Sequence, residues 1–506
     1  MQIHPRKMNK PTKKLRSSLS KRKHNLSGSF STFKVTDAHP NKPTTSKTTI
    51  YENDGIFSVK AKENVFYALI KNPDLGYSLH PDFCYSVKLI PYSNQLMQVD
   101  GYRCKFGEQV KVSTCFGYVS LVTFSKSTEH EPSSCLKDIE LVQSEVGDRY
   151  VELIAFDELT KLYDGQSVLL RVEIDANSMT QFKLVLEYIL KASSPTPAHE
   201  QISRKFTRAP SSVGSMVYKN DAFVELNRRM NLITDKLNIV PRDVILVCGA
   251  TNCGKSTLIH HMINRYLSDN SGHLRRKALY LECDPGQTEF APSGILSLIT
   301  IDKKVLSTPG FKFISTDHSV VLTQPRKIVS KIFGTTSPSE NTFTYMSLIK
   351  DLINEAKLFN HESDLRMPLF INTMGWIEDL GLELLMKIIQ LADPTHVIRI
   401  ESPSEYIEKN YNFLRNEGMV LIGKTKKNKY SNPKLPEDIP LLVMSSRTIQ
   451  FKLWLAFHCV NEFSLNSPYK NSAFRREINQ LAYVTHSFWP EISFLPFFMN
   501  FTAKYV

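Results

Sequence analysis

A glycine-rich turn between two apolar runs most constrains what this chain can fold into. The turn is Gly249-x4-Gly254-Lys255-Ser256. The run "DVILVCGA" leads into its start, and "STLIHHMINRYL" continues from its end. The first run has the length and continuous apolarity of a buried strand, and the second has one apolar helical face. That face comprises Leu258, Ile259, Met262, Ile263, Tyr266 and Leu267. This order is typical of a phosphate loop, so the sequence predicts nucleotide binding.

The phosphate-loop pattern predicts a role for each of its residues. Lys255 is expected to reach the β- and γ-phosphates of ATP, and the Ser256 hydroxyl is expected to hold Mg²⁺. The residues expected to bind the nucleotide are Gly249, Ala250, Thr251, Asn252, Cys253, Gly254, Lys255, Ser256 and Thr257.

Strands and helices alternate around this loop. Further buried strands are predicted at 277–284, 368–375 and 395–400, and helical stretches precede the last two. Alternation of this kind predicts a parallel α/β sheet covered on both faces. The fold class is therefore α/β: a P-loop NTPase domain with a parallel sheet, a β-rich domain before it and a mixed region after it.

Acidic residues end the strand that follows the loop, in "LECDPGQTEFAPSG". Glu282 and Asp284 alternate along the strand, so they are expected to share a face and to point at the nucleotide. Such acids supply a magnesium ligand or a base; a buried capping role is the alternative. Gln287 follows in a Pro-Gly turn and is predicted to orient water or a hydroxyl. His260 and His261, about 100° apart on the predicted helix, are interpreted as surface or packing residues rather than ligands.

The 506 residues divide into four predicted parts. They are a basic tail (1–50), a β-rich domain (51–204), the P-loop domain (205–400) and a C-terminal region (401–506). Four runs suggest the β-rich domain: "CYSVKLIPYS", "GYVSLVTFS", "RYVELIAF" and "SVLLRVEID". The polar stretch 203–215 fits a linker.

The net charge of +13 is concentrated in the tail. Residues 1–50 hold 12 Lys or Arg and one acid, Asp37, which gives +11. This composition is typical of a nuclear or nucleolar address and an RNA-attracting arm. A solvated tail without function and a mitochondrial presequence are the alternatives, although presequences favour Arg and nine of the 12 are Lys.

Other classes find little support in the sequence. No stretch approaches the ~18 apolar residues of a membrane helix, so no membrane association is expected. None of the eight cysteines forms a C-x-x-C pair, which argues against zinc or redox motifs and favours reduced intracellular thiols. There is no Asn-Lys-x-Asp guanine reader, which a GTPase should show, and no helicase motif, which an ATPase motor would show. A kinase for small nucleotides would usually be much shorter.

The motifs together resemble the polynucleotide 5′-hydroxyl kinase family. The resemblance covers residues 205–400 and is carried by "GATNCGKST", "LECDPGQTEFAPSG" and "PLFINTMGWIEDLG". The residues of the last two motifs are most similar to the branch that processes pre-ribosomal RNA in the nucleolus. The resemblance implies ATP-dependent phosphorylation of RNA 5′-hydroxyl ends in spacer processing and large-subunit maturation, with an endonuclease as partner. An ATP-binding scaffold and a P-loop ATPase without kinase activity are the alternatives.

The resemblance also implies roles for individual residues. Asp284 would activate the 5′-hydroxyl, and Thr373, Gly375 and Trp376 would form a clasp in which Trp376 stacks on the terminal nucleotide. Viewed alone, Trp376 fits a core position equally well. The loop 332–341 resembles a substrate-side loop, which makes Gly334 and Ser337 weaker candidates.

The family closes an arginine-bearing lid over the phosphates, and "FRREINQLAY" (474–483) is the best match. Arg475 or Arg476 would then neutralise charge on the transferred phosphoryl group; a solvated helix face is the alternative. Only 30 residues follow Arg476. The C-terminal region is therefore expected to be a shortened form, with "FLPFFMNFTAKYV" packed on the kinase domain.

Overall fold

The structure is a computed structural model. It describes residues 49–80, 84–90, 95–105, 107–114, 120–126, 148–174, 217–219, 221–251, 253–269, 276–306, 326–362, 366–400, 449–451, 472–473, 475–477 and 479–480. Nearly all of the predicted tail, the linker at 203–215, Asn252 and the apolar run 494–506 lie outside these residues. None of the helices in the described part has the length and apolarity that a bilayer crossing requires.

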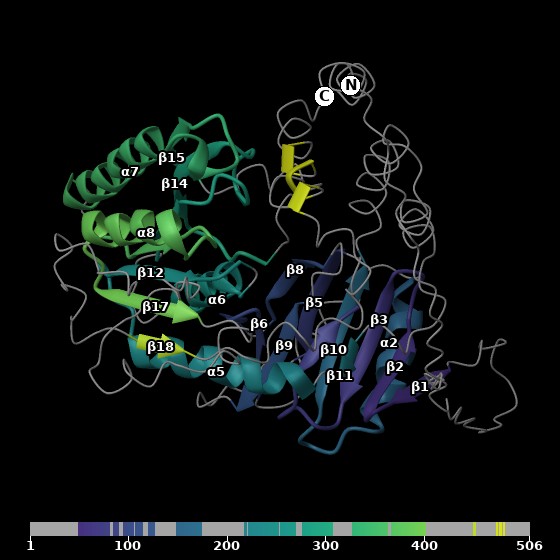
Figure 1. Cartoon of the computed structure of the whole chain (residues 1–506). Coiled ribbons are helices and arrows are strands. Elements are labelled where there is room, and N and C mark those ends of the chain that lie inside the picture. The colour runs from purple at the N-terminus through teal and green to yellow at the C-terminus, as the bar shows by residue number, and fades with distance from the viewer. Residues whose placement is uncertain are drawn as a thin grey trace, which may run out of the picture.

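The N-terminal domain consists of two antiparallel sheets that share one core (Figure 1). The first sheet has the order β1-β2-β3-β10-β5-β8, comprising Ile50–Asn53, Ile56–Lys60, Val65–Ile70, Val168–Ile174, Cys84–Ile90 and Gln109–Ser113. The second has the order β11-β4-β9-β6-β7, comprising Val217–Lys219, Tyr77–Leu79, Leu121–Lys126, Gln95–Val99 and Tyr102–Arg103. Val87 and Val172 of the first sheet pack with Leu79 and Met97 of the second. The predicted β-rich domain is confirmed.

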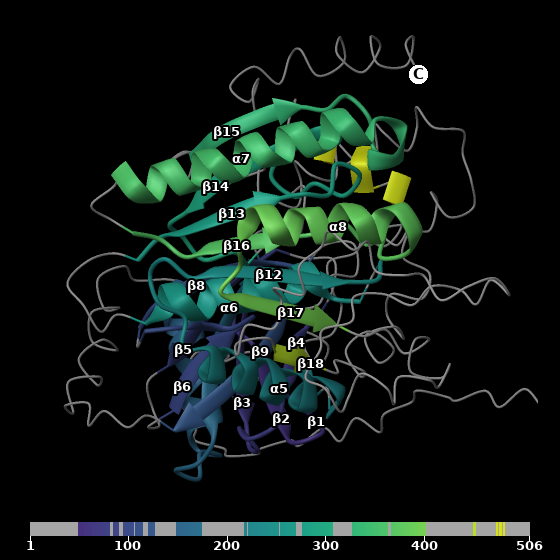
Figure 2. The ribbon, with the colours of Figure 1, turned by 60° about the vertical axis from the view of Figure 1, so that its left-hand side comes forward.

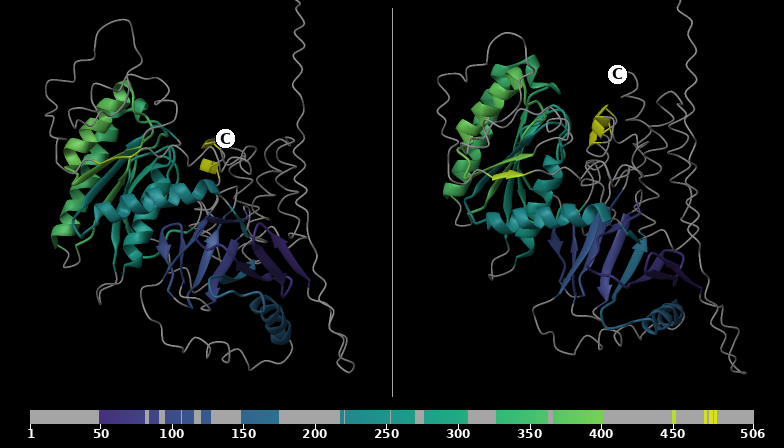
Figure 3. Two further views of the ribbon diagram at one scale, coloured as in Figure 1. Left: turned by 90° about the horizontal axis from the view of Figure 1, so that it is seen from below. Right: turned by 60° about the horizontal axis from the view of Figure 1, so that its bottom comes forward.

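Two details of this domain differ from the prediction. The run "RYVELIAF" is part of helix α2 (Asp148–Thr160), which packs on β2 and β3 through Ala155 and Leu159 (Figure 3). Its alternation is too short to exclude a helix with one buried face. Strand β11 lies beyond the predicted boundary at residue 204 and pairs with β4.

The P-loop domain is built on a seven-stranded sheet of order β15-β14-β13-β16-β12-β17-β18 (Figure 2). These strands are Arg326–Ile332, Ile295–Ile301, Ala278–Glu282, Leu369–Asn372, Val244–Gly249, His396–Ile400 and Ile449–Phe451. The predicted strands around 244–250, 277–284, 368–375 and 395–400 correspond to β12, β13, β16 and β17, which are mutually parallel.

The sheet is mixed, which corrects the prediction of a parallel sheet. Strands β14 and β15 run antiparallel to each other, and β14 runs antiparallel to β13. Strand β18 comes from the predicted C-terminal region and pairs in parallel with β17.

Helices cover both faces of this sheet. They must do so because successive side chains of a strand point to opposite faces, and those of β12 are apolar on both. Helices α5 (Asp221–Leu237) and α6 (Lys255–Ser268) bury Ile245 and Val247 of β12. Helices α7 (Thr342–Glu362) and α8 (Asp379–Ala392) bury Leu246 and Cys248 of the same strand on the other side. β12 is therefore an interior strand that is covered on both faces, and its carboxyl end holds the glycine-rich loop.

The N-terminal domain packs on α6, the helix that begins in the phosphate loop. Asn264 Nδ2 donates to the carbonyl of Asp100 at 2.9 Å, and the N–H of Arg103 donates to Ser268 Oγ at 2.8 Å. Gly101 is required at this contact, because an added Cβ would lie 2.6 Å from the carbonyl oxygen of His261. The two domains thus form a closely packed polar interface.

Candidate active site

The phosphate loop has the backbone geometry that its glycines predict. Gly249 has φ 149° and Gly254 has φ 97°, both in the region that glycine adopts most readily. A Cβ on Gly249 would lie 2.4 Å from the carbonyl oxygen of Ile400. Helix α6 begins at Lys255, so its N-terminal N–H groups and dipole face the loop.

Lys255 is folded onto the loop. Its ammonium group donates to the carbonyls of Gly249 and Ala250 at 3.1 and 2.9 Å. These bonds hold a positive charge against the turn in which phosphate oxygens are expected to bind.

Ser256 is linked to the neighbouring strand by an asparagine that the sequence analysis did not select. Asn372 Nδ2 donates to Ser256 Oγ at 3.1 Å and to the Tyr280 hydroxyl at 2.9 Å. Asn372 is 5% exposed, and its Oδ1 has no hydrogen-bond partner among the described residues. Buried acceptors are usually paired, so this oxygen fits a role toward a bound group. The sequence feature that could have indicated Asn372 is its position at the end of the strand that became β16, which pairs with β12.

Asp284 lies in the turn after β13. Its Oδ1 accepts the N–H of Gly286 at 2.9 Å. Desolvation by burial raises its pKa above the ordinary value, while the Gly286 bond, the charge of Lys255, the Gln287 N–H and the charge of Arg475 act in the opposite direction. A carboxylate on which the charges of a lysine and an arginine act has the electrostatic setting expected of a base in phosphoryl transfer, and that role of Asp284 remains a prediction.

Glu282, by contrast, is engaged by its own loop. Its Oε1 accepts the backbone N–H groups of Glu289 and Phe290, and Ser297 Oγ donates to Oε2 at 3.1 Å. In this arrangement the side chain stabilises the loop that follows Asp284. Its predicted role as a metal ligand remains a prediction, and it would require these bonds to rearrange.

The loop at 332–341 packs on the Asp284 turn. The N–H groups of Phe333 and Gly334 donate to the carbonyl of Gly294 at 2.8 and 2.9 Å. A Cβ on Gly286 would lie 2.7 Å from the carbonyl oxygen of Thr336. Ser337 caps the short helix η5 (Pro338–Glu340) by accepting from the N–H of Ser339. Gly334 and Ser337 therefore belong to a loop beside Asp284, and their substrate contacts remain predictions, as does that of Gln287.

The predicted clasp lies directly against the phosphate loop. Thr373 is 1% exposed and donates to the carbonyl of Val247 at 2.9 Å. Thr251 Oγ1 donates to the carbonyl of Gly375 at 3.3 Å. Trp376 is partly buried against the α7–α8 core and rests on Gly381, where a Cβ would lie 2.4 Å from the indole ring. Packing thus explains Trp376, and its stacking on a nucleotide remains a prediction.

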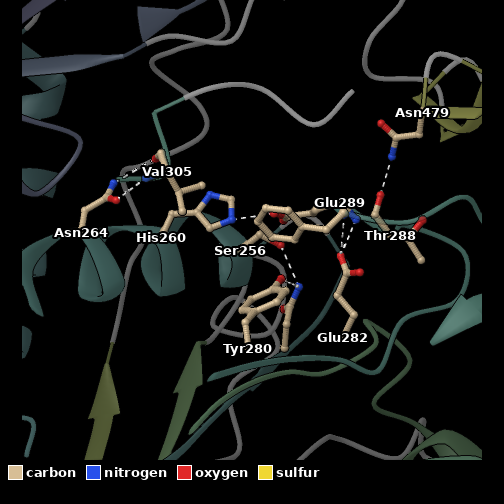
Figure 4. Close-up of polar contacts among 11 residues, drawn as sticks. Ser256, His260, Asn264, Tyr280, Glu282, Thr288, Glu289, Val305 and Asn479 are labelled. Atoms are coloured by element: carbon tan, nitrogen blue, oxygen red, sulfur yellow. Dashed lines mark hydrogen bonds and ion pairs between the residues drawn. The ribbon is translucent and has the colours of Figure 1, made fainter. Parts of the chain in front are cut away.

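The candidate lid segment contacts the loop that follows Asp284. Asn479 Nδ2 donates to the carbonyl of Thr288, and Gln480 Nε2 donates to Ser293 Oγ at 3.1 Å (Figure 4 shows the Asn479 contact). Arg475 is close enough for its charge to lower the pKa of Asp284. Arg476 is not among the largest influences on this pKa. Arg475 is therefore the stronger of the two candidates, and its role in a lid remains a prediction.

The site fits a magnesium–nucleotide complex. The glycine turn leaves no room for a Cβ at Gly249, and Lys255 supplies positive charge. The Ser256 hydroxyl accepts from the amide of Asn372, whose Oδ1 has no hydrogen-bond partner among the described residues. Oxygen donors of this type are the ones that Mg²⁺ prefers, either directly or through water. Ser256 would hold the ion, and Asn372 would accept from its water shell.

A central parallel strand that ends in this glycine loop and helix, inside a helix-covered sheet, defines a P-loop NTPase-type fold. Residues 249–435 match the family model described as "mRNA cleavage and polyadenylation factor CLP1 P-loop". The chain is also similar to three curated kinases. Polynucleotide 5′-hydroxyl-kinase NOL9 of Bos taurus is 38% identical over 181 residues, which is 36% of this chain and 22% of the relative.

NOL9 of Homo sapiens is 35% identical over 221 residues, 42% of this chain and 28% of the relative. Polynucleotide 5′-hydroxyl-kinase GRC3 of Gibberella zeae is 32% identical over 175 residues, 34% and 23% of the two chains. The matched segments thus span about a quarter of the length of these relatives. The solved "wild-type Clp1p-Pcf11p (454 -563) complex" has a TM-score of 0.45 at 11% identity, covering 84% of this chain and 73% of that chain. The predicted resemblance to the polynucleotide 5′-hydroxyl kinases is confirmed.

Proposed function

We propose that this chain is an ATP-dependent polynucleotide 5′-hydroxyl kinase acting on RNA ends. One observation carries the proposal: the ammonium group of Lys255 lies on the glycine turn, where it donates to the carbonyls of Gly249 and Ala250, and its charge also acts on the Asp284 carboxylate. The similarity to proteins named polynucleotide 5′-hydroxyl-kinase supports the same reaction class. ATP and Mg²⁺ are the expected cofactors.

The proposed chemistry is in-line phosphoryl transfer. The RNA 5′-oxygen forms a bond to the γ-phosphorus, the bond from that phosphorus to the β,γ-bridging oxygen breaks, and the hydroxyl proton moves to Asp284. ADP and a 5′-phosphorylated RNA are the products. Lys255 and Arg475 stabilise the charge that develops on the equatorial oxygens, and magnesium supplies further positive charge when it is bound.

The choice of Asp284 as base follows from its pKa. A base is most effective when its pKa is raised toward the working pH while it stays ionised. Desolvation raises the pKa of Asp284, and the two cations limit that rise. Glu282 is a poorer candidate for the base, because its oxygens already accept three hydrogen bonds from the loop and Ser297.

We further propose that the substrate is pre-ribosomal RNA, cut by an endonuclease partner during processing of an internal transcribed spacer and maturation of the large ribosomal subunit. The nucleolus is the proposed location. The basic tail (1–50) supports this proposal through its charge of +11. Imaging the full chain beside a form lacking residues 1–50 tests the location: the shortened form should leave the nucleolus yet keep its activity on short RNA.

The activity is tested with ATP labelled at the γ-phosphate and a short single-stranded RNA that carries a 5′-hydroxyl. We expect label on this RNA and none on the same RNA carrying a 5′-phosphate; DNA of the same sequence measures the preference for RNA. Lys255→Met should lower transfer by about 10²-fold or more, since removal of one electrostatic donor has this effect in other enzymes.

Lys357→Met is the matched control, because Lys357 of α7 also donates to a backbone carbonyl, that of Leu391 of α8. ATP binding without any transfer would favour a scaffold. Hydrolysis of ATP that does not depend on a 5′-hydroxyl would favour a P-loop ATPase.

A further inference from the structure

A buried histidine–glutamate pair joins the phosphate-loop helix to the loop that follows Asp284. His260 Nε2 lies 2.5 Å from Glu289 Oε2, and the two side chains are only 6% and 4% exposed (Figure 4). His260 lies one turn after Ser256 on α6. Glu289 lies two residues after Gln287. The pair therefore spans the two elements that carry the proposed chemistry.

Glu289 is tied at its backbone as well as at its side chain. Its N–H donates to Glu282 Oε1, so strand β13 and helix α6 hold the same residue from two directions. At the other end of the loop, the N–H of Gly294 donates to the carbonyl of Pro285 at 2.8 Å. The loop 284–294 is therefore a closed unit. The His260–Glu289 pair attaches it to α6, and Phe290 packs in the apolar core to which α6 contributes.

The adjacent residue receives the arginine-bearing segment. The carbonyl of Thr288 accepts a bond from Asn479, four residues after Arg475. Consecutive residues, Thr288 and Glu289, thus contact the lid candidate and the phosphate-loop helix. A shift of α6 on nucleotide binding would reach both the Asp284 turn and the segment that carries Arg475 through this short piece of chain.

Stability alone gives a weak account of such a pair. Desolvation of two ionisable groups offsets much of their attraction, and well-packed apolar side chains often replace a buried pair without loss of stability. What an apolar replacement cannot supply is a directional bond that fixes the loop relative to the helix. The geometry favours a positional role.

We propose that His260 and Glu289 are positioning residues that transmit the state of the phosphate loop to the Asp284 loop and to the Arg475 segment. This inference rests on the proposed kinase function for its catalytic consequence. The coupling itself is a property of the fold that is measured without any transfer reaction.

The test uses the full chain with His260→Leu and Glu289→Met combined. We expect a melting temperature near that of the wild type, since the pair is replaced by apolar groups of similar size. Affinity for a non-hydrolysable ATP analogue should stay within about threefold, because the pair lies outside the loop. Transfer should fall about 10²-fold in kcat, with KM for ATP nearly unchanged, as expected for misplaced reacting groups.

Hydrogen–deuterium exchange gives the second measurement. In the wild type the ATP analogue should slow amide exchange in both 249–268 and 284–290; in the paired variant it should slow exchange only in 249–268. If the wild type transfers no phosphate, the kinase proposal fails, and the exchange result alone decides the coupling. Retained protection of 284–290, or a transfer rate within twofold of the wild type, overturns the inference.

Two further variants keep the test decisive if the paired variant is unstable. Glu289→Gln keeps an oxygen that accepts from His260, so it should retain much more transfer than Glu289→Met. Equal loss in both overturns the inference. The matched control removes another ion pair of α6. Arg265 of α6 lies 2.9 Å from Asp235 of α5. Arg265→Met with Asp235→Ala should leave transfer and loop protection unchanged.

Discussion

The side-chain amide of Asn372 donates a hydrogen bond of 3.1 Å to the hydroxyl of Ser256. This bond crosses from β16 to the first turn of α6, and it directs the hydroxyl by which a phosphate loop holds magnesium. We expect Asn372→Leu to weaken the magnesium-dependent part of ATP binding by about 10-fold or more, the usual effect of removing a group that orients a metal ligand. Titration of a fluorescent ATP analogue with and without Mg²⁺ measures the difference.

Asn360→Leu is the matched control for this prediction. Asn360 exchanges two hydrogen bonds with Met367, 2.8 and 3.0 Å long, away from the phosphate loop. Its replacement should lower the melting temperature but leave the ratio of the two affinities unaltered. The same ratio in the Asn372 variant as in the wild type would remove Asn372 from the metal site.

Local signals in the sequence predicted the phosphate loop and the four parallel strands, and distant pairing explains what was missed. Gly249 and Gly254 are required where they stand, and the strands beside them are continuous apolar runs. The antiparallel pair β14 and β15 depends on an approach of segments 24 residues apart, which no run of residues encodes. Asn372 gives no periodic signal, because its role arises only when β16 pairs with β12. For the same reason the sequence predicts only a surface or packing role for His260, because its partner, Glu289, lies 29 positions further along the chain.

The charge of Arg475 predicts a shift in the pH dependence of transfer. Arg475 lowers the pKa of Asp284, whereas burial raises it. Since a base acts in its ionised form, transfer falls as the pH drops through this pKa. Arg475→Gln should raise the pKa further and move the acid limb of kcat/KM to higher pH. Arg476→Gln should leave the limb in place.

The pH profile therefore separates the two arginines in a way that a loss of rate does not. Asp284→Asn should bind ATP normally, lose transfer and show no such limb in its residual rate. An acid limb that moves equally in both arginine variants would mean that Arg475 has no special relation to Asp284.

Gly375 predicts a steric effect on the phosphate loop. A Cβ at this position would lie 2.4 Å from Thr251 Oγ1 and 2.7 Å from Thr251 Cα. Gly375→Ala should therefore displace the loop, cost about 1–3 kcal/mol of stability and weaken ATP binding. Adding Thr251→Ala removes only the contact with Oγ1, so it should recover part of the affinity. Isothermal titration with ATP measures both variants.

Gly165→Ala is the control for backbone strain without crowding. Gly165 has φ 81° and no neighbour within 4 Å of an added Cβ, and it lies in the N-terminal domain. Its replacement should reduce stability while ATP affinity is unaffected. Normal ATP affinity in Gly375→Ala would show that the clasp and the loop move apart freely.

The interface between the N-terminal domain and α6 contains two buried groups with opposite responses to pH. Burial lowers the pKa of His261 to about 3, and burial raises the pKa of Asp100 to about 6. His261 takes up its proton more readily in the unfolded chain, so its contribution to stability is lost as the pH falls below about 6.5. Asp100 takes up its proton more readily in the folded chain, so acidification through pH 6 stabilises the fold.

These opposite signs predict the behaviour of two conservative variants between pH 7 and pH 5. Asp100→Asn removes the opposing effect of Asp100. Acidification should then lower the free energy of unfolding by about 2 kcal/mol through the titration of His261. Asparagine tolerates the positive φ of 44° at this position. His261→Gln leaves Asp100 unopposed and should gain about 1 kcal/mol over the same range. Urea unfolding at the two pH values measures the differences, with the exposed His361→Gln as control. A wild-type response outside the interval between the two variants would mean that the two groups do not govern the acid response of this interface.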